Sequence, residues 1–286
     1  MADGTALSGR ALVLGGGGLT GIGWECGVLA GLAEAGLDLG ADADLVVGTS
    51  AGSVVGAQLA SGLIGARELY ERQLLHVPGE TGDRLGAAVL ARYAWGVLRS
   101  RDAETFGARM GALALAAPPS GASAHREVLA ERLLSHAWPE RRLVVTAVDA
   151  HSGVRAAFDR DGEVDLLDAV AASCAVPGVW PPISAAGRHW IDGGIRSATN
   201  ADLAAGYASV VVVAPIAAGG GPIPSARSQA ARLAAAGARV TLITPDRAAR
   251  RAFGRNVLDP ARRAPAARAG LAQAAAHVAE VAAVWR

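Results

Sequence analysis

The feature that most constrains the fold of this chain is a serine flanked by glycines, G-T-S-A-G at Gly48–Gly52. Residues 44–47 before it form a short, largely apolar run typical of a buried strand, and a helix-compatible stretch follows through Leu63. A G-x-S-x-G between a strand and a helix predicts a sharp elbow, since its glycines leave room where neighbouring backbone comes too close for a Cβ. Ser50 then projects near the positive end of the helix dipole, which favours a nucleophile. A serine that only caps the helix is the alternative.

A glycine-rich loop, G-G-G-G-L-T-G at residues 15–21, follows an earlier apolar run at 11–14. Its last six residues also satisfy the dinucleotide-binding pattern G-x-G-x-x-G, which needs an acidic residue at the end of the next strand. Here Asp42 and Asp44 come before that strand, so a dinucleotide cofactor is not expected. Consecutive strands usually neighbour each other, and the loop is therefore predicted to lie beside the elbow and to present backbone N–H groups to an oxyanion. A purely structural turn is the alternative.

A third loop begins at the end of a predicted strand, where Gly193 and Gly194 follow Asp192. Aspartate is common in turns for structural reasons alone, but Ser50 needs a base. None of the six histidines has a convincing setting for that role: His76, His125, His136, His151, His189 and His277. His189, three residues before Asp192, would point to the opposite face of an extended strand. Asp192 is therefore a candidate base for the serine.

The order strand, loop, helix, strand, loop, helix over residues 11–63 implies parallel strands joined by right-handed crossovers. Further strand signals occur at 143–148, 154–158, 190–191, 210–213 and 240–243, with helical patterns at 165–173 and from Pro265 to Trp285. We expect one domain over residues 1–286, an α/β fold in which a three-layer α/β/α sandwich surrounds a mostly parallel central sheet. The less regular region 78–124 is either a helical cap over the site or a plain helical spacer.

Taken in order, the three loops resemble those of the patatin-like phospholipases, which share a Gly-rich oxyanion loop, a G-x-S-x-G elbow and a D-G-[AG] turn. Residues 172–183 also resemble the proline-containing stretch that precedes the aspartate in that family, and Asn200 matches its usual sequel. The resemblance covers residues 10–215. Thr20 stands where the family often has Arg or Lys, so a cation near the site is lost.

The resemblance implies a serine acyl-ester hydrolase that acts on phospholipids or related lipid esters, with a patatin-like fold and no metal or other cofactor. Ser50 is then the nucleophile, activated directly by Asp192 without a histidine. The oxyanion hole is formed by backbone amides of Gly16, Gly17 and Gly18. The remaining motif glycines support these turns: Gly21, Gly48, Gly52, Gly193 and Gly194. Two alternatives stay open, a Ser-His-Asp α/β-hydrolase or acyltransferase and a catalytically silent lipid-binding scaffold.

The charge of the chain is unevenly distributed. Residues 1–226 hold 16 Arg against 23 Asp and Glu, a net charge of −7, whereas residues 227–286 hold 11 Arg against 3, a net charge of +8. The basic C-terminal helical region is either a contact surface for anionic membrane lipid or a solvated face. The candidate lipid contacts are Arg247, Arg250, Arg251, Arg255, Arg262 and Arg263. Nucleic acid is not an expected partner, because Phe253 is the only aromatic residue that interleaves these arginines.

Scarce residue types narrow the chemistry and the expected location. All 27 basic residues are arginine, which excludes a phosphate-loop lysine, a Schiff-base lysine and a Ser-Lys dyad. Cys26 and Cys174 are far apart and lack metal-ligand spacing, so a reducing compartment is expected. The first ten residues carry Asp3 and no long apolar run, unlike a secretory signal, and the uncharged stretch 203–226 is broken by Gly and Pro. We expect a cytoplasmic protein, either soluble or peripherally attached to a membrane.

Overall fold

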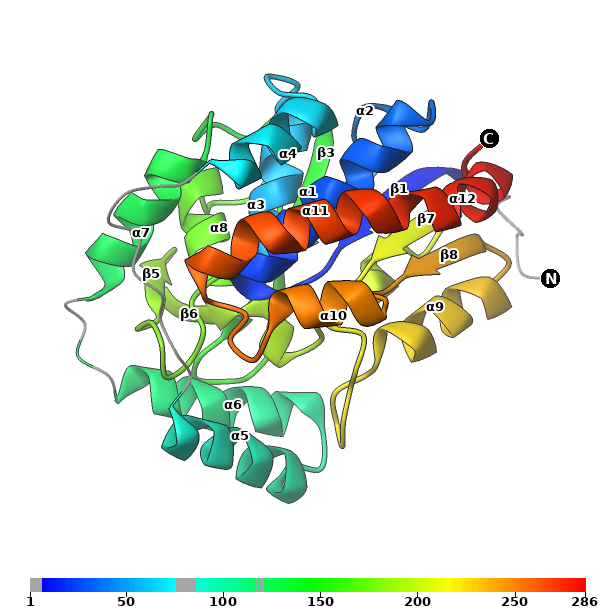
Figure 1. Cartoon of the computed structure of the whole chain (residues 1–286). Coiled ribbons are helices and arrows are strands. Elements are labelled where there is room, and N and C mark those ends of the chain that lie inside the picture. Colours follow the sequence, from blue (N-terminus) through cyan, green and yellow to red (C-terminus); the bar gives the residue numbers. More distant parts are fainter. Residues whose placement is uncertain (1–6, 76–85, 117, 119–120) are drawn as a thin grey trace.

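The computed structural model describes residues 7–75, 86–116, 118 and 121–286, and Figure 1 shows helices on both faces of one central sheet. The sheet has the strand order β5-β6-β3-β2-β1-β7-β8, with β4 also paired to β3. In chain order the strands are β1 (Ser8–Leu14), β2 (Leu45–Thr49), β3 (Arg142–Asp149), β4 (Arg155–Phe158), β5 (Ile183–Ala185), β6 (Arg188–Asp192), β7 (Tyr207–Val213) and β8 (Arg239–Ile243). The α-helices are α1 (Gly18–Glu34), α2 (Leu39–Asp42), α3 (Ala51–Ala60), α4 (Ala66–Leu74), α5 (Ala87–Arg99), α6 (Ala103–Leu115), α7 (Gly121–Arg132), α8 (Leu166–Ser173), α9 (Ala226–Ala235), α10 (Arg247–Phe253), α11 (Arg263–Ala274) and α12 (Val278–Trp285). The predicted three-layer α/β/α fold is confirmed.

Strands β3, β2, β1, β7 and β8 run parallel to one another. Strand β1 lies between β2 and β7, so Val13 is opposite Val47 on one side and Val212 on the other. Beyond β2, strand β3 is joined by β4 and β6 in antiparallel orientation. The mostly parallel sheet is as predicted, whereas β5 and the antiparallel direction of β6 were not predicted. Strand β6 follows β5 directly in a hairpin, whereas a parallel pair would need a crossover connection such as a helix. Strand β6 is therefore antiparallel to β5, and it is also antiparallel to β3.

Alternate residues of β1 face opposite layers of helices. Leu12 and Leu14 belong to the large cluster that includes residues of α1, α3, α8 and α11, whereas Ala11 and Val13 belong to a smaller cluster with α9. Successive side chains of a strand point to opposite faces, so an unbroken apolar strand needs cover on both. The run at 11–14 is apolar throughout for this reason.

The helix that follows the glycine-rich loop, α1, packs closely against α11 from the C-terminal region. A Cβ on Gly27 would overlap the carbonyl oxygen of Ala267, and a Cβ on Gly270 would overlap that of Trp24. Across the same contact, Trp24 Nε1 donates a hydrogen bond to Gln273 Oε1 at 3.1 Å. The predicted Ala-rich terminal helix is therefore two helices, α11 and α12, of which α11 is a buried part of one layer.

Five helices were not predicted: α2, α4, α7, α9 and α10. Their segments are short or strongly charged, as in α4 (A-R-E-L-Y-E-R-Q-L), so the local apolar pattern is weak. Packing on neighbouring elements stabilises these helices. For example, α4 buries Leu69 and Tyr70 in the large core cluster. Within the described ranges no helix has the length and apolar content that crossing a bilayer requires.

Gly27→Ala is expected to lower the free energy of unfolding by about 1–3 kcal/mol, because the added methyl group overpacks the contact between α1 and α11. Urea denaturation followed by circular dichroism measures the change. Gly220→Ala is the matched control, since a Cβ at that position meets no atom within 4 Å. Equal unfolding free energies for the two variants would contradict the close packing of these helices.

Candidate active site

The register of the sheet carries the elbow serine and the candidate base to the same place. Thr49, the last residue of β2, lies opposite Thr146 of β3. The next residue of β3, Ala147, lies opposite Asp192 at the end of β6. Ser50 and Asp192 are 142 positions apart in the chain. Both nevertheless lie at the sheet position that follows the Thr49–Thr146 pair, one residue further along the direction of β2 and β3.

Ser50 stands in a strained turn between β2 and α3. Its backbone has φ 52° and ψ −118°, a conformation that costs a residue with a Cβ about 1–3 kcal/mol. The turn is tight enough that a Cβ on Gly52 would overlap the carbonyl oxygen of Leu14, and one on Gly48 would lie 2.6 Å from Cα of Ser53. Within the described residues, the Ser50 hydroxyl makes no capping hydrogen bond to α3. The helix-cap alternative therefore does not account for this serine.

Both peptide groups of Ser50 are held by other serines. The Ser50 N–H donates to Oγ of Ser173 at 2.8 Å, and Oγ of Ser53 donates to the Ser50 carbonyl at 2.7 Å. These bonds help to offset the backbone strain of the turn. Sequence analysis missed Ser173, because a serine at the end of α8 carries no local signal for a contact 123 positions away.

Asp192 ends β6 and is buried, with a side chain 5% exposed. Its Oδ1 accepts a hydrogen bond from the Gly194 amide at 2.6 Å, and a Cβ on Gly193 would overlap the carbonyl oxygen of Thr146. Burial raises the pKa of Asp192 from 3.8 to about 6, and hydrogen bonds from the Ser50 side chain and the Gly194 amide oppose that rise. The Asp192 carboxyl group is thus still ionised at neutral pH, and the Ser50 side chain helps to keep it so.

A buried network centred on Asn200 ties the elbow to the aspartate turn. Asn200 Nδ2 lies within hydrogen-bond distance of Thr49 Oγ1 at 3.1 Å and Thr146 Oγ1 at 3.2 Å. It also donates to the carbonyls of Ser197 at 2.8 Å and Gly193 at 3.3 Å. The two threonine hydroxyls are 2.9 Å apart. Asn200 therefore acts through its neighbours, as a residue that positions the ends of β2, β3 and β6.

The glycine-rich loop lies beside the elbow, where a Cβ on Gly16 would come 3.3 Å from the Ser50 Cβ. The Gly16 N–H, however, donates to the carbonyl of Ala198 at 2.7 Å, so the prediction of Gly16 as an oxyanion donor is not supported by this geometry. The next two residues are Gly17 and Gly18, which begin α1. No acceptor within the described residues takes the N–H of either one.

The loop also packs on the elbow through Gly21, where a Cβ would lie 3.4 Å from Cβ of Ala51. The side chain at the family's usual cation position, Thr20, is buried and turns to its own helix end, with its hydroxyl 3.4 Å from the Gly17 carbonyl. The site therefore has no cation at this point of the loop.

Five of the six histidines lie in the described part of the chain, and none of them forms a hydrogen bond with Ser50 or Asp192. His125 is buried and stacks on Trp180 with ring centres 4.6 Å apart, and burial lowers its pKa to about 4. His151 and His189 meet edge to face at 5.5 Å. The remaining two contact Ala130 and Gln273 respectively: His136 and His277. His76 lies outside the described residues.

The charge of Asp192 raises the pKa of two further side chains, Cys174 and Tyr93. Cys174 is half-buried next to Ser53, with Sγ 3.8 Å from Oγ, and desolvation together with the Asp192 charge raises its thiol pKa to about 12. Tyr93 of α5 donates its hydroxyl to the carbonyl of Pro177 at 3.1 Å, and burial and Asp192 raise its pKa well above the ordinary value. Both groups stay protonated at neutral pH. Tyr93 places α5, in the predicted cap region, beside the carboxylate.

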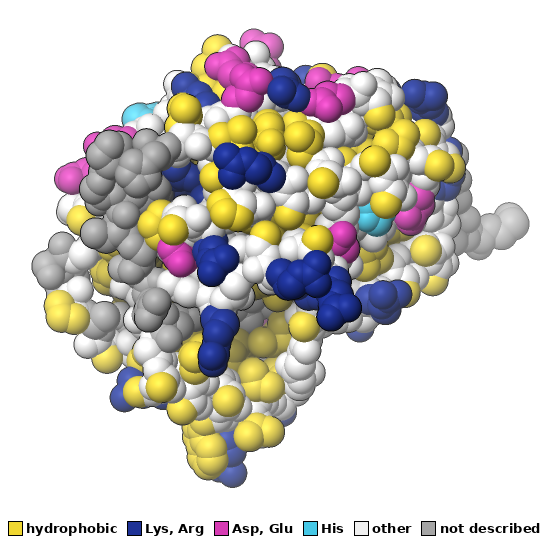
Figure 2. Space-filling model, viewed as in Figure 1, with side chains coloured by type: hydrophobic (Ala, Val, Ile, Leu, Met, Phe, Trp, Pro, Cys, Tyr) yellow, Lys and Arg dark blue, Asp and Glu magenta, His cyan; other side chains and the backbone are white. Residues whose placement is uncertain are grey.

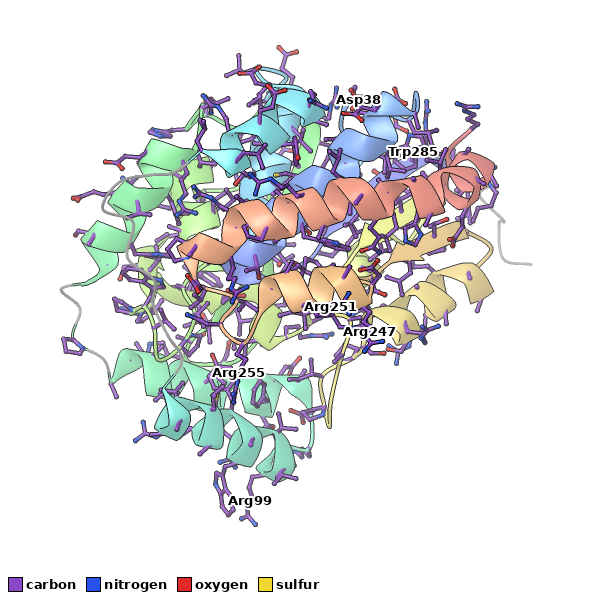
Figure 3. All side chains as sticks on the ribbon, in the orientation of Figure 1. Asp38, Arg99, Arg247, Arg251, Arg255 and Trp285 are labelled. Atoms are coloured by element: carbon purple, nitrogen blue, oxygen red, sulfur yellow. The ribbon has the colours of Figure 1, made fainter. Side chains whose placement is uncertain are left out.

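The arginines of the C-terminal region divide into exposed and buried groups. Arg247 and Arg251 of α10 and the following Arg255 are exposed on the same side of the molecule, as Figure 3 shows. In Figure 2, several arginine side chains gather on this side of the surface. Arg250 and Arg262 are also exposed. Arg263 is buried and donates to the carbonyl of Leu75 at 3.0 Å, so its prediction as a lipid contact is wrong. The start of α11 packs inward on α1, which carries this side chain into the protein.

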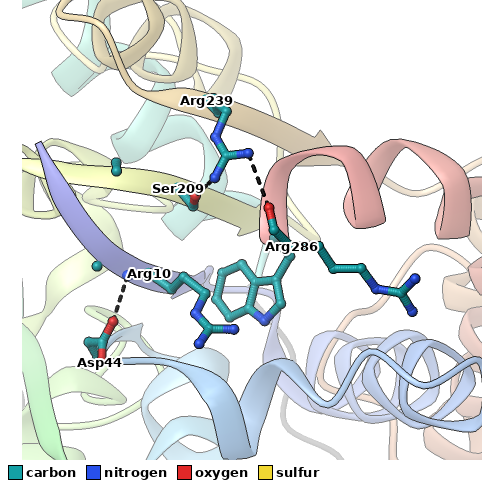
Figure 4. Close-up of a pocket in the computed structure, with 8 residues that line it drawn as sticks. Arg10, Asp44, Ser209, Arg239 and Arg286 are labelled. Carbon is teal, nitrogen blue, oxygen red and sulfur yellow. Dashed lines mark hydrogen bonds between the residues drawn. The ribbon is translucent and has the colours of Figure 1, made fainter.

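A pocket of about 400 Å³ lies at the amino ends of the strands, away from the loops that carry Ser50 and Asp192 (Figure 4). Its residues are Gly9, Arg10, Asp44, Ala208, Ser209, Arg239, Trp285 and Arg286. They are held by local contacts, such as Arg239 to Ser209 Oγ at 2.7 Å and the Arg10 amide to Asp44 Oδ2 at 2.7 Å. In the part of the chain that is described, no group of three His, Cys, Asp or Glu side chains is arranged to hold a metal ion.

The family model described as patatin-like phospholipase matches residues 12–205. Among solved structures, VipD from Legionella pneumophila is 14% identical with a TM-score of 0.47, and the match covers 96% of this chain and 67% of that one. The type III effector protein ExoU is 16% identical with a TM-score of 0.42, covering 96% of this chain and 53% of that one. These TM-scores are too low to support a functional argument. A comparison with curated proteins gave no match.

Ser173→Ala is expected to lower the free energy of unfolding by about 1–3 kcal/mol, because the buried Ser50 N–H loses its acceptor. It should also reduce ester hydrolysis, since the strained turn loses one of its restraints. Ser184→Ala, on the exposed face of β5, serves as the control and should leave both quantities unchanged. Denaturation curves and hydrolysis rates that match the parent would remove Ser173 from this role.

Proposed function

Because the chain belongs to the patatin-like phospholipase family, a family of lipid ester hydrolases, we propose that Ser50 is its nucleophile and Asp192 the base that activates it. One observation carries the proposal: the register of the sheet brings a serine in a strained turn near a buried carboxylate, whose pKa the serine side chain lowers. Strain in the backbone persists where the surrounding structure enforces it, and such places are often functional. The Asn200 network, which joins the two turns, supports a pair held at a set separation.

In the first step, the ionised Asp192 takes the proton of the Ser50 hydroxyl as Oγ attacks the acyl carbonyl carbon of the lipid ester. An ordinary carboxylate is a weak base for a hydroxyl. Burial raises the pKa of Asp192 to about 6, which brings it closer to that of the group it must deprotonate. Direct activation by the carboxylate then needs no histidine between the two groups.

The negative charge that develops on the carbonyl oxygen is stabilised by the amides of Gly17 and Gly18, whose N–H groups are free of acceptors among the described residues. These amides begin α1, a 17-residue helix, so the helix dipole adds to the stabilisation. Gly16 contributes through its missing side chain, which leaves room beside Ser50. A single such donor is worth about 3 kcal/mol of barrier in other hydrolases.

The intermediate collapses when the bond to the alcohol breaks, and the alcohol leaves with the proton held by Asp192. An acyl group is then bound to Ser50 Oγ. Asp192, again ionised, takes a proton from a water molecule whose oxygen attacks the acyl carbon. The bond between the acyl carbon and Ser50 Oγ then breaks, and Oγ takes the proton back from Asp192. The fatty acid is released and the enzyme is restored.

The exposed C-terminal arginines are proposed to contact the membrane that holds the lipid substrate. Arg247, Arg251 and Arg255 are exposed together, and their charge is suited to the anionic surface of a membrane. Peripheral contact through them brings the enzyme to its lipid substrate. Arg263 has no part in it, because it is buried.

Ser50→Ala and Asp192→Asn are each expected to lower kcat/KM for a p-nitrophenyl acyl ester by about a thousandfold or more, with the fold intact by circular dichroism. A fluorophosphonate probe should label the parent and leave Ser50→Ala unlabelled. Asp161→Asn, at an exposed turn, is the control and should keep full activity. Activity retained in either dyad variant would exclude that residue, and loss in a single histidine variant, His76→Ala included, would favour a Ser-His-Asp mechanism.

The pH dependence follows from the raised pKa of Asp192. Below about 6 the carboxyl group is protonated and cannot accept the serine proton, so log kcat/KM should fall with unit slope as the pH drops through that value. Above it the carboxylate is ionised and the acid limb is complete. An initial-rate profile on a soluble ester measures the midpoint. A midpoint near 4, the value of an exposed aspartate, would contradict a buried base.

A further inference from the structure

Helix α5 is attached to the protein by one narrow face. A Cβ on Gly178 would lie 2.6 Å from the Val89 side chain of α5. A Cβ on Gly96 of α5 would lie 3.0 Å from the side chains of Phe106 and Met110 in α6. Tyr93, between them, donates to the Pro177 carbonyl. These inward residues follow the spacing of one helix face, and Gly96 is the only fully buried residue of the helix.

The opposite face of α5 is apolar and exposed to solvent. Leu90 is 52% exposed, Trp95 61% and Leu98 79%. The alanines of the helix complete this outer face: Ala87, Ala88, Ala91 and Ala94. A helix on the surface of a globular protein normally presents polar side chains outward, whereas these outward side chains of α5 are apolar. In Figure 2 hydrophobic side chains gather on this end of the molecule.

The charges of α5 are of one sign. The helix has no acidic residue, and its two charged side chains are Arg92 and Arg99. The Arg99 guanidinium lies over the Trp95 ring at 5.5 Å, which places the cation at the border of the apolar face. Apolar and tryptophan side chains with arginines beside them are the composition of a helix that lies in a membrane interface.

The position of α5 connects this face to the catalytic loops. Its inner side packs on residues 177–178, which follow α8 and the Ser173 hydroxyl that holds Ser50. Tyr93 and Val97 pack against the hydrophobic cluster that contains Ile191, next to Asp192. In Figure 3 Arg251 lies on α10, and Arg255 lies between α10 and the helix pair α5 and α6. A surface that contacted α5 would therefore lie close to the dyad.

We infer that the outer face of α5, formed by Leu90, Trp95 and Leu98 with Arg92 and Arg99, docks on an anionic phospholipid surface and delivers lipid to the neighbouring site. The inference rests on the proposed function, because a lipid hydrolase must reach an ester that is held in a membrane. Charge complementarity favours lipid over a second copy of the chain. Two copies joined through α5 would bring arginines against arginines, whereas anionic headgroups neutralise them.

The test compares Leu98→Glu with Leu63→Glu, since Leu63 is exposed to a similar extent, 64%, in the turn after α3. Binding is measured by co-sedimentation with vesicles of phosphatidylcholine and phosphatidylglycerol. Leu98→Glu should weaken partitioning about tenfold or more, as expected when one leucine no longer enters an apolar phase. Leu63→Glu should bind like the parent. Binding of the parent should rise with phosphatidylglycerol and fall with added NaCl.

Trp95 gives an independent readout, because a tryptophan within the interface is quenched by brominated lipid. Quenching should occur in the parent and fall sharply in Trp95→Phe, in which the other five tryptophans remain. Loss of quenching to the same extent in Leu63→Glu would point to a general defect and overturn the assignment to α5.

Catalysis and docking are separated by the soluble ester. Leu98→Glu should hydrolyse p-nitrophenyl butyrate at the parent rate while its hydrolysis of vesicle lipid falls, whereas Ser50→Ala should bind vesicles normally and hydrolyse neither. Failure of the dyad assignment thus leaves the binding result intact. Equal vesicle binding by parent, Leu98→Glu and Leu63→Glu would overturn the inference. So would a change from dimer to monomer in Leu98→Glu, by size-exclusion chromatography, with vesicle binding unaltered.

Discussion

The rest of the site depends on the close contact between the elbow at Gly52 and the end of β1 at Leu14. Gly52 lies so close to the Leu14 carbonyl that no side chain fits between them, and the Gly52 N–H donates to the next carbonyl, that of Gly15, at 3.0 Å. This contact fixes the start of α3 against the glycine-rich loop, directly after the strained backbone of Ser50. The hydrogen bonds from Ser53 and to Ser173 then hold the serine where the closing of the turn has put it.

The same compactness determines the electrostatics of the site. Asp192 is removed from water, so its charged form is destabilised and its pKa rises, while the Ser50 side chain and the Gly194 amide lower the pKa and keep the carboxylate ionised at neutral pH. Thr20 adds no positive charge at the loop. In the proposed mechanism, stabilisation of the oxyanion therefore falls to backbone dipoles, which are fixed by the fold and need no reorganisation during the reaction.

Two surfaces of different character lie near this site. The arginines of α10 and the turn after it supply positive charge, and α5 supplies an apolar face with cations at its border. Long-range attraction and insertion into an interface are separate contributions, the first screened by salt and the second not. An enzyme that presents both beside its catalytic loops would be oriented as well as attracted by a lipid surface.

The sequence by itself determined the parallel core of the sheet, the elbow at Ser50, the adjacent glycine loop and the aspartate turn, because glycine spacing and apolar runs act on the local backbone. Only the tertiary structure decided that the Gly16 amide is taken by Ala198, that Ser173 and Asn200 hold the two turns, and that Arg263 is buried. It also decided the antiparallel direction of β6 and which face of α5 is left uncovered. These features depend on partners far away in the chain. A hydrogen bond or a buried face is settled by what the fold brings alongside it, and no local pattern of residues carries that information.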